Sequence, residues 1–214
     1  MLHSGEESSG NVPSLLFIEE GKYMAGKRVG DVFATYVEVK IPLSIYGAGR
    51  EKTTLVGFGL SIEGNKSDGI VEIGELTIMG GKGVGLYANQ GMNLSVRNCS
   101  IAMCQWRGVN AYNADISCDN LQVIGCFSSG VWAHNATITL SGKETSIQGN
   151  VTAGSSDCYG LHAGFHGNTR FSKIQLVTPL TKEIISTNNG GGGNWGEYST
   201  IEQIETPSQV VQHV

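Results

Sequence analysis

Apolar and polar residues alternate along most of this chain with a period of two, most clearly from Val71 onward. Apolar residues spaced three and four positions apart, which indicate an amphipathic helix, are absent from the same stretch. Alternation of this kind is typical of β-strands that bury one face, and short polar or glycine-containing segments separate the strands. The pattern therefore predicts an all-β protein.

The strands recur in a repeat of about 22 residues. Successive units read VEIGELTIMGGKGVGLYAN, LSVRNCSIAMCQWRGVNAY, ISCDNLQVIGCFSSGVWAH and ITLSGKETSIQGN. One glycine marks each unit: Gly85, Gly108, Gly130 and Gly160. The last interval is the longest because VTAGSSDC is inserted after Asn150. Several strands per repeat of this length predict a parallel β-helix, a solenoid of about six to eight coils.

Coils stacked in register place equivalent residues directly above one another, about 4.8 Å apart. Three apolar columns follow: Val71, Leu94, Ile116 and Ile138; Leu76, Cys99 and Leu121; Ile78, Ile101, Val123 and Ile147. A fourth column of Gly81, Cys104, Cys126 and Asn150 suits a tight inward corner. Cys104 above Cys126 has two interpretations: two reduced thiols packed as small apolar groups, or a disulfide between coils.

Aromatic and polar side chains form a strip on one outer face of the predicted solenoid. The residues two positions after each repeat glycine point outward, and those two positions further point the same way. These columns are Tyr87, Asn110, Trp132 and His162, and Asn89, Tyr112, His134 and Gly164. Aromatic rings beside amides and imidazoles are typical of surfaces that hold sugar rings. Alternatively, the rings only shield the backbone, as β-propensity favours. The candidate ligand-binding residues are Tyr87, Asn110, Tyr112, Trp132, His134 and His162.

The other outward columns are short and polar. One contains Glu72, Ser95, Ser117 and Thr139, and another contains Thr77, Ser100, Gln122 and Ser146. Arg97 and Asp119 occupy equivalent positions on adjacent coils. We expect them to form a cross-strand ion pair on a solvated face, worth less than about 1 kcal/mol.

The solenoid is expected to span residues 14–204, between a flexible N-terminal tail at 1–13 and a C-terminal tail at 205–214. The segment TIEQI is expected to close the last coil, after the glycine-rich loop NNGGGGNWGEYST. Solenoid ends need covering because an open coil exposes unpaired strand edges. The tails or a partner are expected to supply that cover.

Over roughly residues 14–200 the chain resembles a known superfamily. The order EEGKY, KIPLSIYGAG and KTTLVG, followed by coils of the CSIAMC type, resembles right-handed parallel β-helix proteins of the pectate-lyase-like superfamily. The resemblance implies a right-handed solenoid. It implies little about activity, because the superfamily includes lyases, hydrolases, esterases, epimerases and noncatalytic proteins.

Composition narrows the functional classes. The chain of 214 residues has 14 Lys and Arg against 19 Asp and Glu, and its net charge is -5. This balance argues against nucleic-acid binding, which depends on basic patches. Neither a signal peptide nor an apolar run long enough to span a membrane is recognisable, which favours an intracellular protein without membrane insertion. The five cysteines form no CxxC pair, so we expect no metal site and no cofactor.

Two functional hypotheses remain. The first is a noncatalytic β-helix scaffold or binding module, whose rigid side face meets a polysaccharide or a partner protein within an assembly. The second is a polysaccharide-active enzyme, a lyase, hydrolase or epimerase, with an unrecognised site. The scarcity of Asp favours the first, because glycosidases need a pair of converging carboxylates and the superfamily's catalytic signatures are missing.

Overall fold

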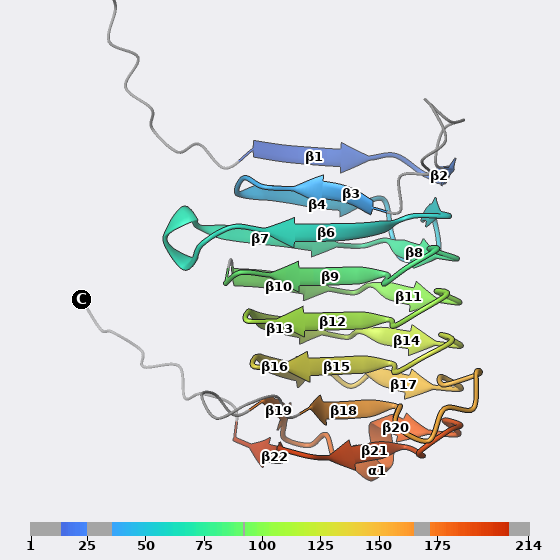
Figure 1. Ribbon diagram of the computed structural model, residues 1–214. Coiled ribbons are helices and arrows are strands. Elements are labelled where there is room, and N and C mark those ends of the chain that lie inside the picture. Colours follow the sequence, from blue (N-terminus) through green and yellow to red (C-terminus); the bar gives the residue numbers. More distant parts are fainter. Residues whose placement is uncertain (1–13, 25–35, 92, 165–171, 206–214) are drawn as a thin grey trace, which may run out of the picture.

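The computed structural model describes residues 14–24, 36–91, 93–164 and 172–205. Over these residues the chain forms a parallel β-helix, whose strands stack as successive rungs from β1 to β22 (Figure 1). This confirms the all-β solenoid. The proposed N-terminal tail, and the C-terminal tail beyond Glu205, lie outside the described residues.

Each coil contributes one strand to each of three parallel sheets. The eight-stranded sheet, here the polar sheet, contains β1 (Ser14–Ile18), β4 (Leu43–Gly47), β7 (Ile70–Gly74), β10 (Asn93–Arg97), β13 (Asp115–Asp119), β16 (Thr137–Ser141), β19 (Lys173–Val177) and β22 (Thr200–Ile204). The second sheet contains β2 (Gly21–Met24), β5 (Thr53–Val56), β8 (Thr77–Met79), β11 (Ser100–Ala102), β14 (Gln122–Ile124), β17 (Ser146–Gln148) and β20 (Ser186–Thr187). The third, here the aromatic sheet, contains β3 (Tyr36–Val39), β6 (Gly59–Glu63), β9 (Leu86–Asn89), β12 (Val109–Tyr112), β15 (Val131–His134), β18 (Leu161–Gly164) and β21 (Trp195–Glu197).

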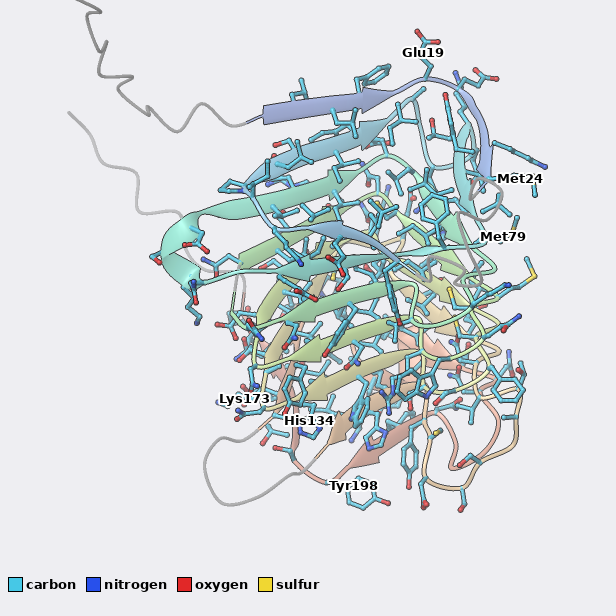
Figure 2. The ribbon with its side chains drawn as sticks, turned by 45° about the horizontal axis from the view of Figure 1, so that its top comes forward. Glu19, Met24, Met79, His134, Lys173 and Tyr198 are labelled. Atoms are coloured by element: carbon cyan, nitrogen blue, oxygen red, sulfur yellow. The ribbon has the colours of Figure 1, made fainter. Side chains whose placement is uncertain are left out.

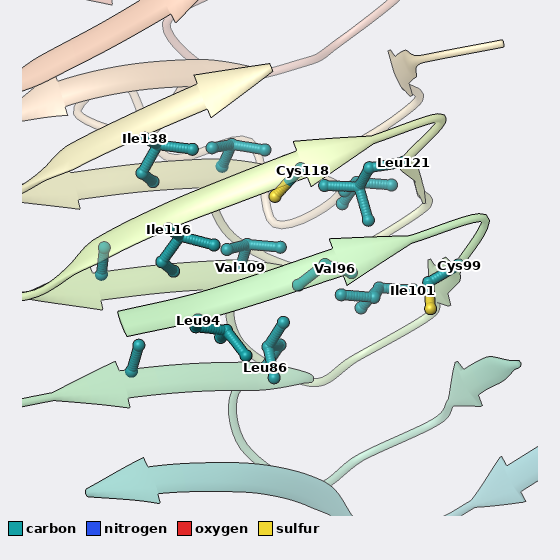
Figure 3. Close-up of a cluster of buried hydrophobic side chains, with 14 of the residues drawn as sticks. Leu86, Leu94, Val96, Cys99, Ile101, Val109, Ile116, Cys118, Leu121 and Ile138 are labelled. Atoms are coloured by element: carbon teal, nitrogen blue, oxygen red, sulfur yellow. The ribbon is translucent and has the colours of Figure 1, made fainter. Parts of the chain in front are cut away.

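The register confirms two of the three predicted apolar columns. Leu94 pairs with Val71 on one side and Ile116 on the other, and Ile116 pairs with Ile138. The column through Ile101 is paired in the same way. These side chains are at most 2% exposed, and Figure 3 shows several of them stacked inside the coils. The core is thus a continuous stack, and burial of these columns is the main stabilising contribution.

The repeat glycines are required because the next coil occupies the space of a side chain. The amide of Leu86 donates to the carbonyl of Gly108 at 2.9 Å, and the amide of Val109 donates to the carbonyl of Gly130 at 2.8 Å. A Cβ at Gly108 would lie 2.7 Å from the Gly130 oxygen, and one at Gly130 would lie 2.8 Å from the Gly160 oxygen. The glycine column therefore fixes the point at which each coil enters the aromatic sheet.

The predicted inward corner is present. Asn150 is 1% exposed, and its side chain accepts a hydrogen bond from the Cys126 amide and donates one to the Val123 carbonyl, both at 3.0 Å. All five cysteines are free, so Cys104 and Cys126 pack as thiols and not as a disulfide.

The last coils contain one short helical turn and the predicted closing strand. β22 pairs in parallel with β19, as expected for TIEQI. Between them lies a single helical turn, α1 (Lys182–Ile185), which the alternation did not indicate. Thr181 caps this turn by accepting a hydrogen bond from the Ile184 amide, and Ile185 is buried. A 3-10 turn, η1 (Lys66–Asp68), precedes β7.

The expected ion pair on the polar sheet does not form. Arg97 and Asp119 are register partners, as predicted. However, the Asp119 carboxylate accepts hydrogen bonds from Ser141 Oγ at 2.9 Å and Asn120 Nδ2 at 3.2 Å, and no ion pair joins it to Arg97 among the described residues. Neighbouring hydroxyl and amide donors satisfy the carboxylate at less entropic cost than a long arginine side chain.

Candidate functional site

Four strands of the aromatic sheet position the predicted strip. β9, β12, β15 and β18 pair so that Tyr87, Asn110, Trp132 and His162 form one column. Asn89, Tyr112, His134 and Gly164 form the neighbouring column. Both columns were predicted from the repeat, and the register confirms them. Alternation then directs Leu86, Ala88 and their equivalents into the core, which leaves the strip on the outer face.

The rings of the strip contact one another across the coils. The Tyr112 and His134 rings are stacked, with centroids 4.9 Å apart and an interplanar angle of 29°. Trp132 meets His134 edge to face at 5.4 Å and lies 5.5 Å from His162. Aromatic pairs at these separations add stability beyond the area they bury. The rings therefore form one connected surface.

Five of the six candidate residues share a hollow of about 430 Å³ on this face. Its lining consists of Tyr36, Val84, Tyr87, Trp106, Arg107, Asn110, Tyr112, Trp132 and His134. His162 is the exception. It lies outside the hollow, in a second ring cluster with Tyr159 at 5.1 Å and Tyr198 at 5.6 Å. Figure 2 labels His134 and Tyr198, which lie on the same side of the solenoid.

Two residues that the sequence pattern did not single out, Arg107 and Tyr36, make key contacts in the lining of the hollow. Arg107 packs against two indoles, with its Cζ atom 3.1 Å from the Trp132 ring centroid and 4.2 Å from that of Trp106. Both contacts fall within the range of cation–π attraction. Tyr36 closes another part of the hollow, and its hydroxyl accepts a hydrogen bond from the Val84 amide at 3.0 Å.

The strip holds polar atoms that are buried yet lack a partner. Trp132 Nε1, Asn110 Oδ1, Asn89 Oδ1 and Arg107 Nε are inaccessible to solvent and make no hydrogen bond with any described residue. Asn110 was expected to be an outward contact residue, but it is only 7% exposed between Tyr87 and Trp132. Buried polar groups are normally hydrogen-bonded, so these four atoms are exceptions that call for a structural or functional reason.

His162 is held neutral by its surroundings. Burial, with the positive charge of Arg107 as a second cause, lowers the pKa of His162 to about 4 from 6.5. Its Nδ1 lies 3.3 Å from Ser129 Oγ. Near neutral pH the imidazole therefore acts as a polar aromatic surface rather than as a cation.

Four of the residues missed by the sequence reasoning occupy a column of their own. Val84, Arg107, Ser129 and Tyr159 each precede a repeat glycine, so one step upstream in the aligned repeats would have found them. Ser129 and Tyr159 contact His162, and Val84 and Arg107 line the hollow. The strip prediction began after the glycine and thus omitted the residues that turn onto the same face.

Within the described part of the chain, no three His, Cys, Asp or Glu side chains are grouped so as to hold a metal ion. No helix in these ranges is both long and apolar enough to cross a bilayer. The lining of the hollow, as far as the structure describes it, contains neither Asp nor Glu.

No match to this chain was found among models of known protein families, among curated proteins or among solved structures.

Proposed function

We propose that this protein is a noncatalytic β-helix module that binds a saccharide in the hollow around Trp132. The observation that supports this proposal is the combination of a 430 Å³ hollow lined by aromatic rings with buried polar atoms that lack partners. Ring faces stack on the apolar side of a sugar ring, and polar atoms at the same place accept and donate hydrogen bonds to its hydroxyls.

The rings are both available and held in place. Trp106 is 47% exposed and Tyr112 is 38% exposed, while Trp132 is half-buried beneath Arg107 and beside His134. A ligand would therefore cover ring surface that is already oriented. Pre-organised side chains lose little conformational entropy on binding, which favours affinity.

The chemistry of the lining favours binding over catalysis. Glycoside hydrolysis uses two carboxyl groups, one on each side of the scissile bond. The described lining offers an arginine, an asparagine, a histidine and tyrosines in their place. The enzyme hypothesis would need acids from another part of the surface.

An array of neutral and acidic oligosaccharides, followed by titration calorimetry, tests the proposal. We expect the wild type to bind at least one class and Trp132→Ala to weaken binding at least about tenfold, since stacking and hydrogen bonding are both lost. Tyr112→Ala is a second variant, chosen because the Tyr112 ring is more exposed than the Trp132 ring. Thr139→Ala, on the outer face of the polar sheet, is the matched control. Absence of binding by the wild type, or equal losses in Thr139→Ala, would overturn the proposal.

A partner protein at the N-terminal end is a second candidate. β1, β2 and β3 are the first strands of their sheets, and Leu15, Phe17 and Met24 are 68%, 58% and 75% exposed. Exposed apolar edge strands are suited to pairing with another chain. Purification from the native source with wild-type and Phe17→Glu baits tests this: a protein bound by the first and lost by the second supports it, and identical sets of bound proteins contradict it.

A further inference from the structure

No acidic side chain among the described residues balances the positive charge of Arg107. Its guanidinium packs on the Trp132 and Trp106 rings, and its Nε is buried without a hydrogen-bond partner among the described residues. By contrast, Arg50 is bound to Glu144 Oε2 at 2.8 Å, and Lys66 is bound to Asp115. None of the ion pairs in the described ranges includes Arg107.

The groups that surround this charge are weak acids or neutral. The neighbours that act on Arg107 electrostatically are Cys158, Tyr87 and Tyr36, and no carboxylate is among them. Burial lowers the pKa of Arg107 to about 10, so the side chain stays protonated at neutral pH. A partly buried, unpaired charge is costly, and proteins usually tolerate one only where a counter-ion or a ligand meets it.

The two indoles also orient the guanidinium. Contact with both rings limits the rotamers of a side chain that would otherwise be flexible. The planar donor fork of arginine matches carboxylate, sulfate and phosphate geometry, and a held fork loses less entropy on binding. Since the whole chain has a net charge of -5, this local positive charge is not part of a general basic surface.

We propose that Arg107 binds an acidic group, a carboxylate or a sulfate, carried by the saccharide that occupies the hollow. The sugar ring next to the acidic group would lie against the neighbouring aromatic rings. This inference rests on the proposed saccharide-binding function and adds the chemical class of the ligand.

The test compares acidic and neutral forms of one backbone. The probes are carboxylated and sulfated glycosaminoglycan tetrasaccharides, their desulfated methyl esters, and neutral glucan tetrasaccharides, measured by calorimetry in low and high salt. We expect the wild type to bind an acidic form at least about tenfold more tightly than its neutral counterpart, because hydrogen bonds to a charged group are the stronger ones. This preference should shrink in high salt. Which of the carboxylated and sulfated forms is bound identifies the acidic group.

Arg107→Gln is expected to abolish the preference, so that this variant binds the acidic and neutral forms with affinities within about threefold of each other. Arg107→Lys keeps the charge without the planar fork and should retain part of the preference, so it serves as a second variant. Arg97→Gln, an exposed arginine on the polar sheet, is the matched control and should behave as the wild type. Melting temperatures establish that each variant is folded.

The outcomes separate the two proposals. If the wild type binds acidic and neutral forms equally, the anion position is wrong and saccharide binding stands. The anion position is equally wrong if Arg107→Gln retains the preference. If no saccharide binds, both proposals are wrong, and binding of an acidic peptide alone would assign Arg107 to a protein partner.

Discussion

The outer faces of the polar sheet and the aromatic sheet belong to the same coils. They differ in whether their polar side-chain atoms form hydrogen bonds within the protein. On the polar sheet, Thr139 Oγ1 donates to Gln175 Oε1 at 3.4 Å, and Gln175 Nε2 donates to Glu202 Oε1 at 2.9 Å. On the aromatic sheet, Asn110 Oδ1 and Trp132 Nε1 are buried without partners among the described residues.

The difference shows which properties of an outward side chain the solenoid determines and which it does not. Register and core packing fix the position of every outward side chain, but not whether its polar atoms find partners within the protein. The polar sheet joins several of its outward polar groups to one another, whereas the aromatic sheet holds unsatisfied groups beside exposed rings. The proposed binding site is placed on the aromatic sheet for this reason.

The largest expected effect comes from the core that both faces share. Ile138 is fully buried in the column beneath the polar sheet, and Ile138→Ala should reduce the free energy of unfolding by about 3 kcal/mol through lost burial and a residual cavity. Ile138→Val is the matched variant and should cost about 1 kcal/mol. Urea unfolding measures both. A loss below about 1 kcal/mol for the alanine variant would mean that the column is not packed as described.

A smaller effect is expected from pH, through one histidine of the aromatic sheet. His162 has a pKa of about 4 in the folded protein, below its ordinary value of 6.5. As pH falls from 6.5 to about 4, the unfolded chain gains a proton that the folded protein does not, so the contribution of His162 to stability is lost across this window. Because His162 is only partly buried, the shift in melting temperature should be limited to a few degrees.

His162→Gln should remove this part of the pH dependence, since glutamine does not titrate. The melting temperatures of both proteins at pH 7 and pH 4.5 give the difference, in which contributions from the acidic residues cancel. Arg97→Gln, on the other face, should retain the full dependence. Parallel curves for the wild type and His162→Gln would show that burial does not depress the pKa of this histidine.

The smallest effect is expected on the polar sheet. Arg97 is exposed and forms no ion pair with Asp119, whose carboxylate is already bonded to Ser141 and Asn120. Arg97→Ala should therefore change the free energy of unfolding by less than about 0.5 kcal/mol and leave saccharide binding unaltered. A loss above about 1 kcal/mol would mean that Arg97 makes a stabilising contact on this face.

The sequence predicts the fold well because every coil of a solenoid repeats the same strand pattern. The glycine intervals place Leu94 over Val71 and Trp132 over Asn110, and the register agrees in both cases. Any error of one residue would have reversed the faces, so the alternation and the glycines together leave little freedom.

The site was only partly predictable because it depends on residues in turns and on the size of neighbouring side chains. Arg107 lies in a turn, where alternation with a period of two does not predict which way a side chain points. Its contact with Trp132 arises from tertiary packing. Asn110 was assigned to the correct column, but its burial depends on the size of the two rings beside it. The turn α1 was missed because four residues are too few to establish a helical period.

The inserted segment, residues 151–158, shows how the outer face of the aromatic sheet can vary without a change in strand register. The strands on either side of it remain in register, with Val131 paired to Leu161. Nevertheless, the segment brings Cys158 near Arg107 and leads into Tyr159 of the second ring cluster. Turns of this solenoid can therefore vary in length and chemistry while the scaffold stays constant. For the proposed binding site, changes in a turn could therefore alter the lining chemistry while the paired strands keep their register.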